Sequence, residues 1–227
     1  MTPTTTPQEP PVYRAVRAVG VLRPTFQPNA STAFADKLDV RGTAFWLREE
    51  RVLVTCAHVV QDIATAPVEV GGLLVVGNRG NYARATVAIV DFAHDLAILH
   101  FDAPDDHRAR EASDGLALAS SYPTVGVRVG YAGFPLGTQV MNSTQAPTYS
   151  EGVVGAQLRL GAANRKQIQV TGAVVGGFSG APVVATSDPD RVVGVLSNSP
   201  SREAGTANIF MAISWEHVVA IVRLATS

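Results

Sequence analysis

A serine set between glycines is the residue of this sequence best placed to act as a nucleophile. Ser179 lies in Gly177-Phe178-Ser179-Gly180, with Val174-Val175 before it and Val183-Val184 after it. Glycine reaches backbone angles that a side chain forbids, so the pattern predicts two strands joined by a tight turn. Such a turn exposes the Ser179 hydroxyl and directs the amides of Gly177 and Ser179 at one point, as an oxyanion hole requires. A plain glycine-rich hairpin with a small residue at its tip would give the same short pattern.

A histidine and an aspartate earlier in the chain supply the other two groups that acyl transfer needs. His58 follows the strand-like run Arg51–Thr55, and Asp95 directly precedes the aliphatic run Leu96–Leu99. Asp91 is a rival for the acidic role, but it does not adjoin that run. His, Asp, Ser is one of the chain orders known for a catalytic triad. We therefore expect Ser179 to attack a carbonyl, His58 to take its proton and Asp95 to orient the imidazole.

The sequence gives less support for a cysteine nucleophile, a metal site or the nucleophile elbow of another hydrolase fold. Cys56 is two residues from His58, and we interpret it as a buried, inert thiol. We interpret His94 as a surface residue. No His/Cys/Asp spacing suggests a metal site, so we expect neither a metal nor a cofactor. Ser179 also fits a nucleophile elbow, G-x-S-x-G, followed by Asp190 and His217; however, residue 181 is alanine and the βαβ alternation of that fold is missing.

Composition narrows the class of protein. The chain has 227 residues, a net charge of −1 and a pI near 6.5, which gives no electrostatic basis for a nucleic-acid partner. Its apolar runs are strand-sized, so we expect no membrane-spanning helix. The single cysteine excludes internal disulfides and fits a reducing compartment. Since Met1–Pro11 also has no signal-peptide pattern, we expect a cytoplasmic protein.

Short strands in two series predict an all-β fold. The first series precedes residue 103 and comprises Val40–Leu47, Arg51–Thr55, Val68–Val76, Ala83–Asp91 and Leu96–Phe101, with Val12–Leu22 readable as either strand or helix. The second comprises Arg128–Gly133, Tyr149–Leu160, Lys166–Val170, Ala181–Ala185, Val192–Ser197 and Ile209–Ile213. Each series of about six strands suits one closed antiparallel barrel.

The domain organisation follows from these two series. We expect a disordered tail over 1–11, a barrel over 12–110 carrying His58 and Asp95, and a polar linker over 111–125. A second barrel over 126–213 carries Ser179. A helix over 214–227 follows, with Ser214 as its N-cap and an apolar stripe of Trp215, Val218, Val219 and Val222.

The ordered motifs resemble trypsin-like serine peptidases, especially bacterial HtrA/Deg-type domains. The resemblance covers about Gly42 to Ile213 and rests on Gly42-Thr43-Ala44-Phe45, Thr55-Cys56-Ala57-His58, Asp95-Leu96-Ala97-Ile98, Gly130-Tyr131-Ala132-Gly133-Phe134-Pro135 and the Ser179 stretch. It implies a chymotrypsin-like double barrel of two six-stranded antiparallel barrels with a C-terminal helix. It also implies a serine endopeptidase that acts on a polypeptide substrate. Since the residues after the predicted helix do not resemble the PDZ module of some HtrA-type proteins, we expect a peptidase domain without that module.

The resemblance also assigns a substrate cleft. It implies Ala173 at the base of the specificity pocket, Ser199 and Asn208 at its walls, and backbone pairing with substrate along Ser197, Asn198 and Ser199. Because that base has no acidic residue, we expect a preference for a small or medium apolar side chain rather than arginine or lysine.

Two positions next to Ser179 depart from the family pattern, and Cys56 also stands where the family usually has alanine. Phe178 stands where the family has asparagine or aspartate, and Ala181 stands where it has glycine. Without an acidic residue at 178, no activating cut of the chain is implied. These departures also support an alternative, in which the chain is a catalytically silent binding or scaffold module. An active peptidase and a silent scaffold could each work with partner modules or regulators as part of a larger protein system.

Overall fold

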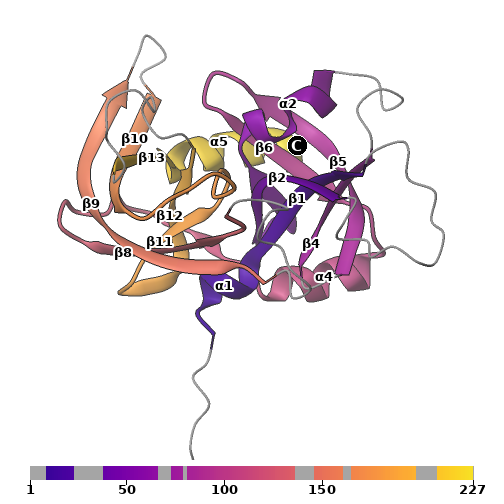
Figure 1. The fold of residues 1–227 in the computed structure, drawn as a ribbon, viewed down its shortest axis with the longest axis horizontal. Helices are drawn as coiled ribbons and strands as arrows, with labels where there is room; N and C mark the ends of the chain where they lie inside the picture. The colour runs from indigo at the N-terminus through magenta and orange to yellow at the C-terminus, as the bar shows by residue number, and fades with distance from the viewer. Residues whose placement is uncertain are drawn as a thin grey trace, which may run out of the picture.

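A computed structural model describes residues 9–22, 38–65, 73–78, 81–135, 146–160, 165–197 and 209–226. The chain forms two β-barrels side by side, with a C-terminal helix packed across them (Figure 1). The all-β prediction of two six-stranded antiparallel barrels and a terminal helix is confirmed.

The first barrel is closed and antiparallel. Its strand order is β1-β2-β3-β6-β5-β4, and the pairing of β1 with β4 closes it. The strands are β1 (Val16–Leu22), β2 (Leu38–Leu47), β3 (Val52–Thr55), β4 (Leu73–Asn78), β5 (Asn81–Asp91) and β6 (Leu96–Phe101). Valine, isoleucine, leucine and phenylalanine fill these strands, and side chains of this kind pack well on a pleated surface.

The second barrel has the order β11-β8-β9-β10-β13-β12, and the pairing of β11 with β12 closes it. A short strand, β7 (Ala117–Leu118), runs parallel to β12 on the outside. The six barrel strands are β8 (Arg128–Gly133), β9 (Thr148–Leu160), β10 (Arg165–Gly172), β11 (Pro182–Ala185), β12 (Asp188–Leu196) and β13 (Ile209–Ser214).

Four helices lie outside the barrels in the described part of the chain. They are α1 (Pro11–Ala15), α2 (Ala57–Thr65), α4 (Asp105–Ser113) and α5 (Trp215–Thr226). The Ser214 hydroxyl accepts a hydrogen bond from the Glu216 amide at 3.4 Å, as an N-cap does. No helix among the described residues is long and apolar enough to cross a membrane.

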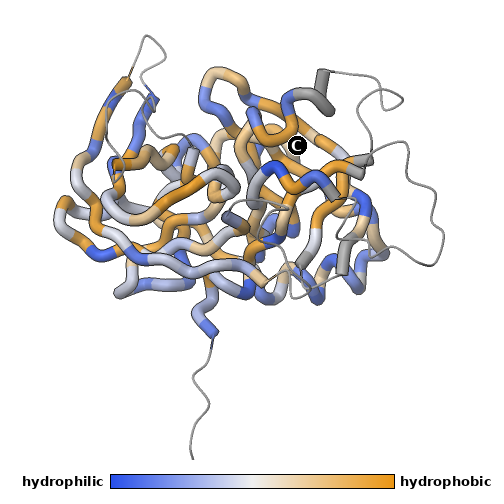
Figure 2. Tube along the Cα trace, in the orientation of Figure 1, coloured by the Kyte–Doolittle hydropathy of each residue, from blue (hydrophilic) through white to orange (hydrophobic). Residues whose placement is uncertain are grey.

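The hydrophobic core is continuous from the first barrel into α5. Phe45, Trp46 and Leu53 of the first barrel join Val218 and Ile221 of α5 in one buried cluster. A second cluster, with Val129, Ile168 and Phe210 among its members, fills the second barrel. Figure 2 shows apolar residues along the strands of both barrels. The C-terminal helix therefore completes the core of the barrel that is furthest from it in sequence.

Two short helices, α1 and α4, were not predicted as separate elements from the sequence. Residues 12–22 are neither all helix nor all strand, because α1 ends at Ala15 and β1 begins at Val16. Helix α4 forms over Asp105–Ser113, across the predicted boundary at residue 110 between the first barrel and the polar linker. Tertiary contacts explain α4, since Ala112 is buried and Glu111 pairs with the buried Arg17 through a 2.5 Å contact. Residues 1–8 of the predicted tail lie outside the described residues, and Pro11 already belongs to α1.

Replacing Phe45 with alanine should lower the free energy of unfolding by about 3–5 kcal/mol. The side chain is fully buried in the first barrel, so its removal loses apolar burial and leaves a cavity. Urea unfolding of the variant measures the change. Phe92→Ala is the matched control, because that ring is 55% exposed; its loss should change stability by no more than about 0.5 kcal/mol. Equal effects of the two substitutions would contradict this account of the core.

Candidate active site

The side chains predicted to do chemistry lie on three segments that each follow the end of a strand. β3 ends at Thr55 and α2 begins at Ala57, which places His58 in the first turn of the helix. Asp95 lies in the turn between β5 and β6 with a φ of 58°, a left-handed conformation that aspartate tolerates better than most residues. Ser179 lies in the loop between β10 and β11. The fold therefore brings the three residues to one junction from both barrels.

His58 and Asp95 are joined by their side chains and by the backbone. The imidazole Nδ1 lies 2.9 Å from Asp95 Oδ2 and 3.0 Å from Oδ1, and the His58 amide donates to Oδ1 at 3.0 Å. A carboxylate facing Nδ1 favours the tautomer with a proton on that nitrogen, which leaves Nε2 as the acceptor. The His58 side chain is 33% exposed, whereas that of Asp95 is 15% exposed.

Ser197 links this pair to the predicted nucleophile. Its hydroxyl donates to Asp95 Oδ2 at 2.5 Å, and its carbonyl accepts a 3.3 Å hydrogen bond from the Ser179 hydroxyl. Among the hydrogen bonds of the described residues, none joins Ser179 to His58. The sequence predicted that Ser197 pairs with the substrate backbone, and it gave no signal for the bond to Asp95, because that bond depends on how the barrels meet.

The surroundings of Asp95 determine its charge. Burial opposes ionisation of the carboxyl, but hydrogen bonds from His58 and Ser197 and the nearby imidazole outweigh it and lower the pKa below its usual value. Asp95 is therefore a charged acceptor at neutral pH.

The loop around Ser179 depends on two glycines with left-handed backbone angles. Gly177 has a φ of 101° and Gly180 a φ of 88°. A Cβ at Gly177 would lie 2.1 Å from the Phe134 carbonyl oxygen, and one at Gly180 would lie 2.0 Å from that of Thr43. Other residues therefore cannot replace them without moving the backbone.

Hydrogen bonds hold this loop on the end of β12. The Gly180 amide donates to the Leu196 carbonyl at 2.7 Å, and the Leu196 amide donates to the Ala181 carbonyl at 2.8 Å. The amides of Gly177 and Ser179 have no acceptor within the part of the chain that the structure describes. The strand β10 is slightly longer than the predicted Lys166–Val170, but Val174 and Val175, which were expected in a strand directly before the turn, are not in a strand.

Cys56 lies behind the His58–Asp95 pair. It is fully buried, and its thiol donates to the Leu196 carbonyl at 3.2 Å. Burial, and then the charge of Asp95, raise the pKa of the thiol well above its usual value. One donor atom from each of Cys56, His58 and Asp95 lies within 4.8 Å of the others, a grouping that could hold a metal ion and that sequence spacing did not predict. In this structure the Cys56 thiol donates to the Leu196 carbonyl, and His58 and Asp95 bond to each other.

The predicted specificity pocket is described only at its base. Ala173 is exposed, and its carbonyl accepts a hydrogen bond from the Tyr131 hydroxyl at 3.1 Å. Asn198, Ser199 and Asn208 lie outside the described residues. Tyr131 was missed as a residue of the site, although the motif that contains it was recognised.

Comparison with known proteins identifies the family. A sequence model of the trypsin-like peptidase domain matches residues 42–195. The chain belongs to this family. The predicted resemblance to trypsin-like peptidases is thereby confirmed. No curated protein matches the sequence.

Solved structures of other proteases share the fold of this trypsin-like peptidase domain. The active form of the Rv3671c protease from M. tuberculosis is 20% identical, with a TM-score of 0.65 over 95% of this chain and 81% of that one. The HtrA-type protease AlgW, solved with a decapeptide, is 19% identical, with a TM-score of 0.67 over 94% of this chain. This chain covers 64% of the length of that AlgW chain. At these identities the likeness concerns the fold.

The departure at Phe178 has a structural explanation in this peptidase domain. Phe178 is 2% exposed and packs edge-on against Tyr131, with ring centroids 5.6 Å apart and planes at 82°. Such a pair is stabilising beyond its buried area. Apolar packing thus fixes the residue before Ser179. Ala181 is fully buried in the same cluster.

The rival residues of the sequence analysis lie elsewhere. Asp91 binds His94, with 2.6 Å between Oδ2 and Nδ1, so it does not serve His58. His94 was predicted to be a surface residue, but it is partly buried and stacks on His217 of α5 at a centroid distance of 4.1 Å. Burial, and then His94, lower the pKa of His217, and its Nε2 accepts a hydrogen bond from the Lys166 amide. The nucleophile-elbow alternative fails because Asp190 pairs with Arg48 and the fold is all-β.

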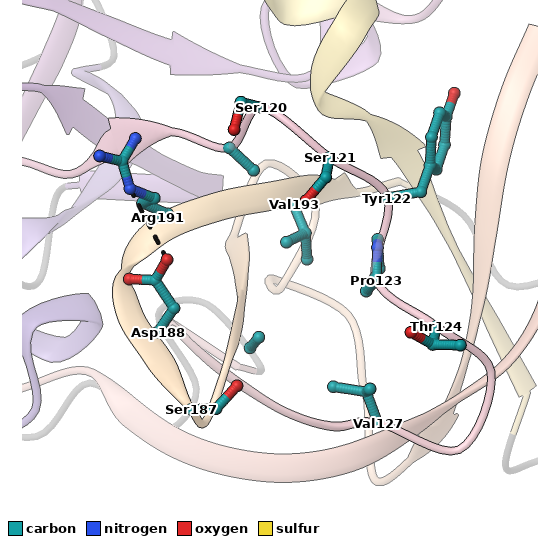
Figure 3. Close-up of a pocket in the computed structure, with 12 residues that line it drawn as sticks. Ser120, Ser121, Tyr122, Pro123, Thr124, Val127, Ser187, Asp188, Arg191 and Val193 are labelled. Carbon is teal, nitrogen blue, oxygen red and sulfur yellow. Dashed lines mark ion pairs between the residues drawn. The ribbon is translucent and has the colours of Figure 1, made fainter.

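A separate hollow lies between the inter-barrel connection and the β11–β12 hairpin (Figure 3). Its volume is about 400 Å³, and an ion pair between Asp188 and Arg191 lies at its rim. Several serine and threonine hydroxyls line it, but its lining residues include no histidine to act as a base. The hollow therefore lacks the groups that nucleophilic catalysis needs.

Asp95 should make stability depend on pH in a defined direction. Its pKa is lowered in the folded chain, so its charge stabilises the fold above the unfolded value near 4, and this contribution is lost as the pH falls through the folded pKa. Asp95→Asn should therefore be less stable than the wild type at pH 7, and the difference should shrink below about pH 4. Urea unfolding across this range measures it. Asp188→Asn, at an exposed side chain, is the control; a difference for Asp95→Asn that does not change with pH would contradict the assignment.

Cys56 should resist alkylation in the folded protein. A buried thiol with a raised pKa gives almost no thiolate, which is the reactive form. We expect iodoacetamide at pH 8 to modify Cys56 only after urea unfolds the chain, as intact-mass spectrometry would show. Modification of the folded protein at the rate of a free thiol would show that the site is open.

Proposed function

We propose that the chain is a serine endopeptidase that hydrolyses peptide bonds through Ser179, His58 and Asp95. The observation that carries the proposal is the 2.9 Å contact between His58 Nδ1 and the charged Asp95 carboxylate, at the loop that holds Ser179. Membership of the trypsin-like peptidase domain family supports it. AlgW was solved with a decapeptide, which supports a polypeptide substrate here.

In the first step, the Ser179 Oγ attacks the carbonyl carbon of the scissile bond. His58 Nε2 takes the hydroxyl proton, and Asp95 stabilises the imidazolium that forms. The proton then passes to the leaving amine as the C–N bond breaks. This step leaves an ester between Ser179 and the acyl part of the substrate.

The oxyanion of the tetrahedral intermediate lies between the amides of Gly177 and Ser179. These donors have no acceptor among the described residues, so they are available to the substrate. Each donor contributes about 3 kcal/mol to transition-state stabilisation in related chemistry. Water then attacks the ester with His58 as the base, and the same amides stabilise the second oxyanion. The bond between the acyl carbon and Ser179 Oγ breaks, His58 returns the proton to Oγ, and the carboxylic acid product leaves.

The reaction requires one movement. The Ser179 hydroxyl donates to the Ser197 carbonyl, and rotation about its Cα–Cβ bond must redirect it to His58 Nε2. Catalytic hydrogen bonds of free enzymes are often formed only when substrate binds. The same bond favours the alternative function, a binding module that keeps the fold without turnover.

The pocket base and the loop suggest how the peptidase selects substrate and becomes active. Ala173, at the base of the proposed pocket, has no charge, so a small or medium apolar side chain is favoured before the cleaved bond. Phe178 is buried against Tyr131 and needs no ionic partner, so activity requires no cut of the chain. Cleavage profiling on a peptide library tests the preference.

Ser179→Ala and His58→Ala should each reduce kcat by a factor on the order of 10⁵ to 10⁶, because a triad acts as a unit. Asp95→Asn should reduce it by roughly 10⁴. A fluorophosphonate probe should label wild-type Ser179, and Ser179→Ala should abolish the label.

Controls use residues of the same types away from the site. Ser187→Ala, at the rim of the hollow in Figure 3, and His100→Ala, at an exposed side chain, should label like the wild type. Absence of labelling and of cleavage in folded wild-type protein would exclude the endopeptidase and favour the scaffold.

A further inference from the structure

Thr43 belongs to β2 of the first barrel, yet its hydrogen bonds reach the loop of Ser179. The residue is fully buried. Its amide donates to the Ser179 carbonyl at 2.8 Å, and its hydroxyl donates to the Gly177 carbonyl at 2.7 Å. Thr43 therefore binds the carbonyls of the two residues whose amides form the proposed oxyanion hole.

The hydroxyl of Thr43 also accepts a hydrogen bond, from the Phe134 amide at 3.1 Å. Both hydrogen-bonding functions of the hydroxyl are thus used inside the protein, and its direction is fixed. Its carbonyl accepts from the Thr55 hydroxyl at 2.7 Å. Four hydrogen bonds consequently hold one side chain and its backbone between the barrels.

Two glycines, Gly133 and Gly180, pack directly against Thr43. A Cβ at Gly133 would lie 2.7 Å from the Thr43 hydroxyl, and a Cβ at Gly180 would lie 2.0 Å from the Thr43 carbonyl oxygen. Contacts this short leave no room for a side chain. The backbone of the Ser179 loop therefore approaches Thr43 as closely as packing allows.

Gly177 is the residue of this loop most in need of an external restraint. Glycine has wide conformational freedom, and its φ of 101° is one of several angles it could adopt. A hydrogen bond to the Gly177 carbonyl fixes the plane of the peptide group between Gly177 and Phe178. This peptide group lies between the amides of Gly177 and Ser179, so its orientation sets how the two amides point relative to each other. Without it, the amides of Gly177 and Ser179 would not stay aimed at one point.

We propose that the Thr43 hydroxyl is a positioning residue for the oxyanion-binding amides. The inference rests on the proposed endopeptidase function. Thr43 touches no substrate atom; it acts through the Gly177 carbonyl. Its loss should therefore reduce transition-state stabilisation more than substrate binding, which lowers kcat and leaves KM nearly unchanged.

Kinetics of three variants test this role. Thr43→Val keeps the shape of the side chain but removes the hydroxyl, and it should reduce kcat roughly 100-fold, as misplaced catalytic groups do. Thr43→Ser restores the hydroxyl and should recover kcat to within a few-fold of the wild type. Thr55→Val is the matched control, because it removes a buried hydroxyl that bonds to the Thr43 carbonyl and not to Gly177. It should lower the urea midpoint by a similar amount with kcat little changed.

A second measurement does not need activity. In the Ser179→Ala background, Thr43→Val should raise amide hydrogen exchange over residues 173–181 by roughly tenfold, the effect of losing one buried hydrogen bond. Thr55→Val should leave that segment nearly unchanged. Wild-type kcat in Thr43→Val, equal kcat losses in the two valine variants, or unchanged exchange would overturn the positioning role. If the wild type neither cleaves peptides nor labels, the proposed function fails, and the exchange result alone decides whether Thr43 restrains the loop.

Discussion

The charged carboxylate of Asp95 is the group on which the arrangement of the two barrels depends. With its side chain only 15% exposed, it needs hydrogen-bond donors in place of water. The first barrel supplies the ring and amide of His58, and the second supplies the hydroxyl of Ser197. If the barrels moved relative to each other, the Asp95 carboxylate would lose its hydrogen bond from Ser197. The need to keep this buried charge hydrogen-bonded therefore constrains how the two closed barrels pack.

The loop of Ser179 is restrained from two directions by different forces. Hydrogen bonds from Thr43 hold its carbonyls, while the ring of Phe178 packs against Tyr131. Tyr131 also binds the Ala173 carbonyl at the start of the loop. Phe178 departs from the family pattern, but its ring is buried against Tyr131 and helps to hold the Ser179 loop in place. Glycine at 177 and 180 provides the turn, and these contacts remove the freedom that glycine brings.

The sequence predicted the all-β architecture well because alternating apolar strands and glycine turns are local signals. It did not predict α4, whose residues Asp105–Ser113 have no apolar stripe and become helical where Arg17 and Glu111 pair across the fold. It also missed the side-chain roles of Ser197, Tyr131 and Thr43. Each depends on contacts between segments more than 40 residues apart or on the meeting of the barrels, and nothing in the local pattern encodes such a contact. Motif order predicted His58 and Asp95 as partners, whereas the stack of His94 on His217 could be found only in three dimensions.

The packing of α5 has a consequence for the order of folding. Val218 and Ile221 of α5 share a buried cluster with Phe45 and Leu53, and His217 supports the turn that ends in Asp95. The ribosome makes the helix after both barrels, so the amino-terminal barrel emerges without part of its core. The nascent chain therefore cannot complete the surroundings of the Asp95 carboxylate until α5 has been synthesised and has packed against the first barrel.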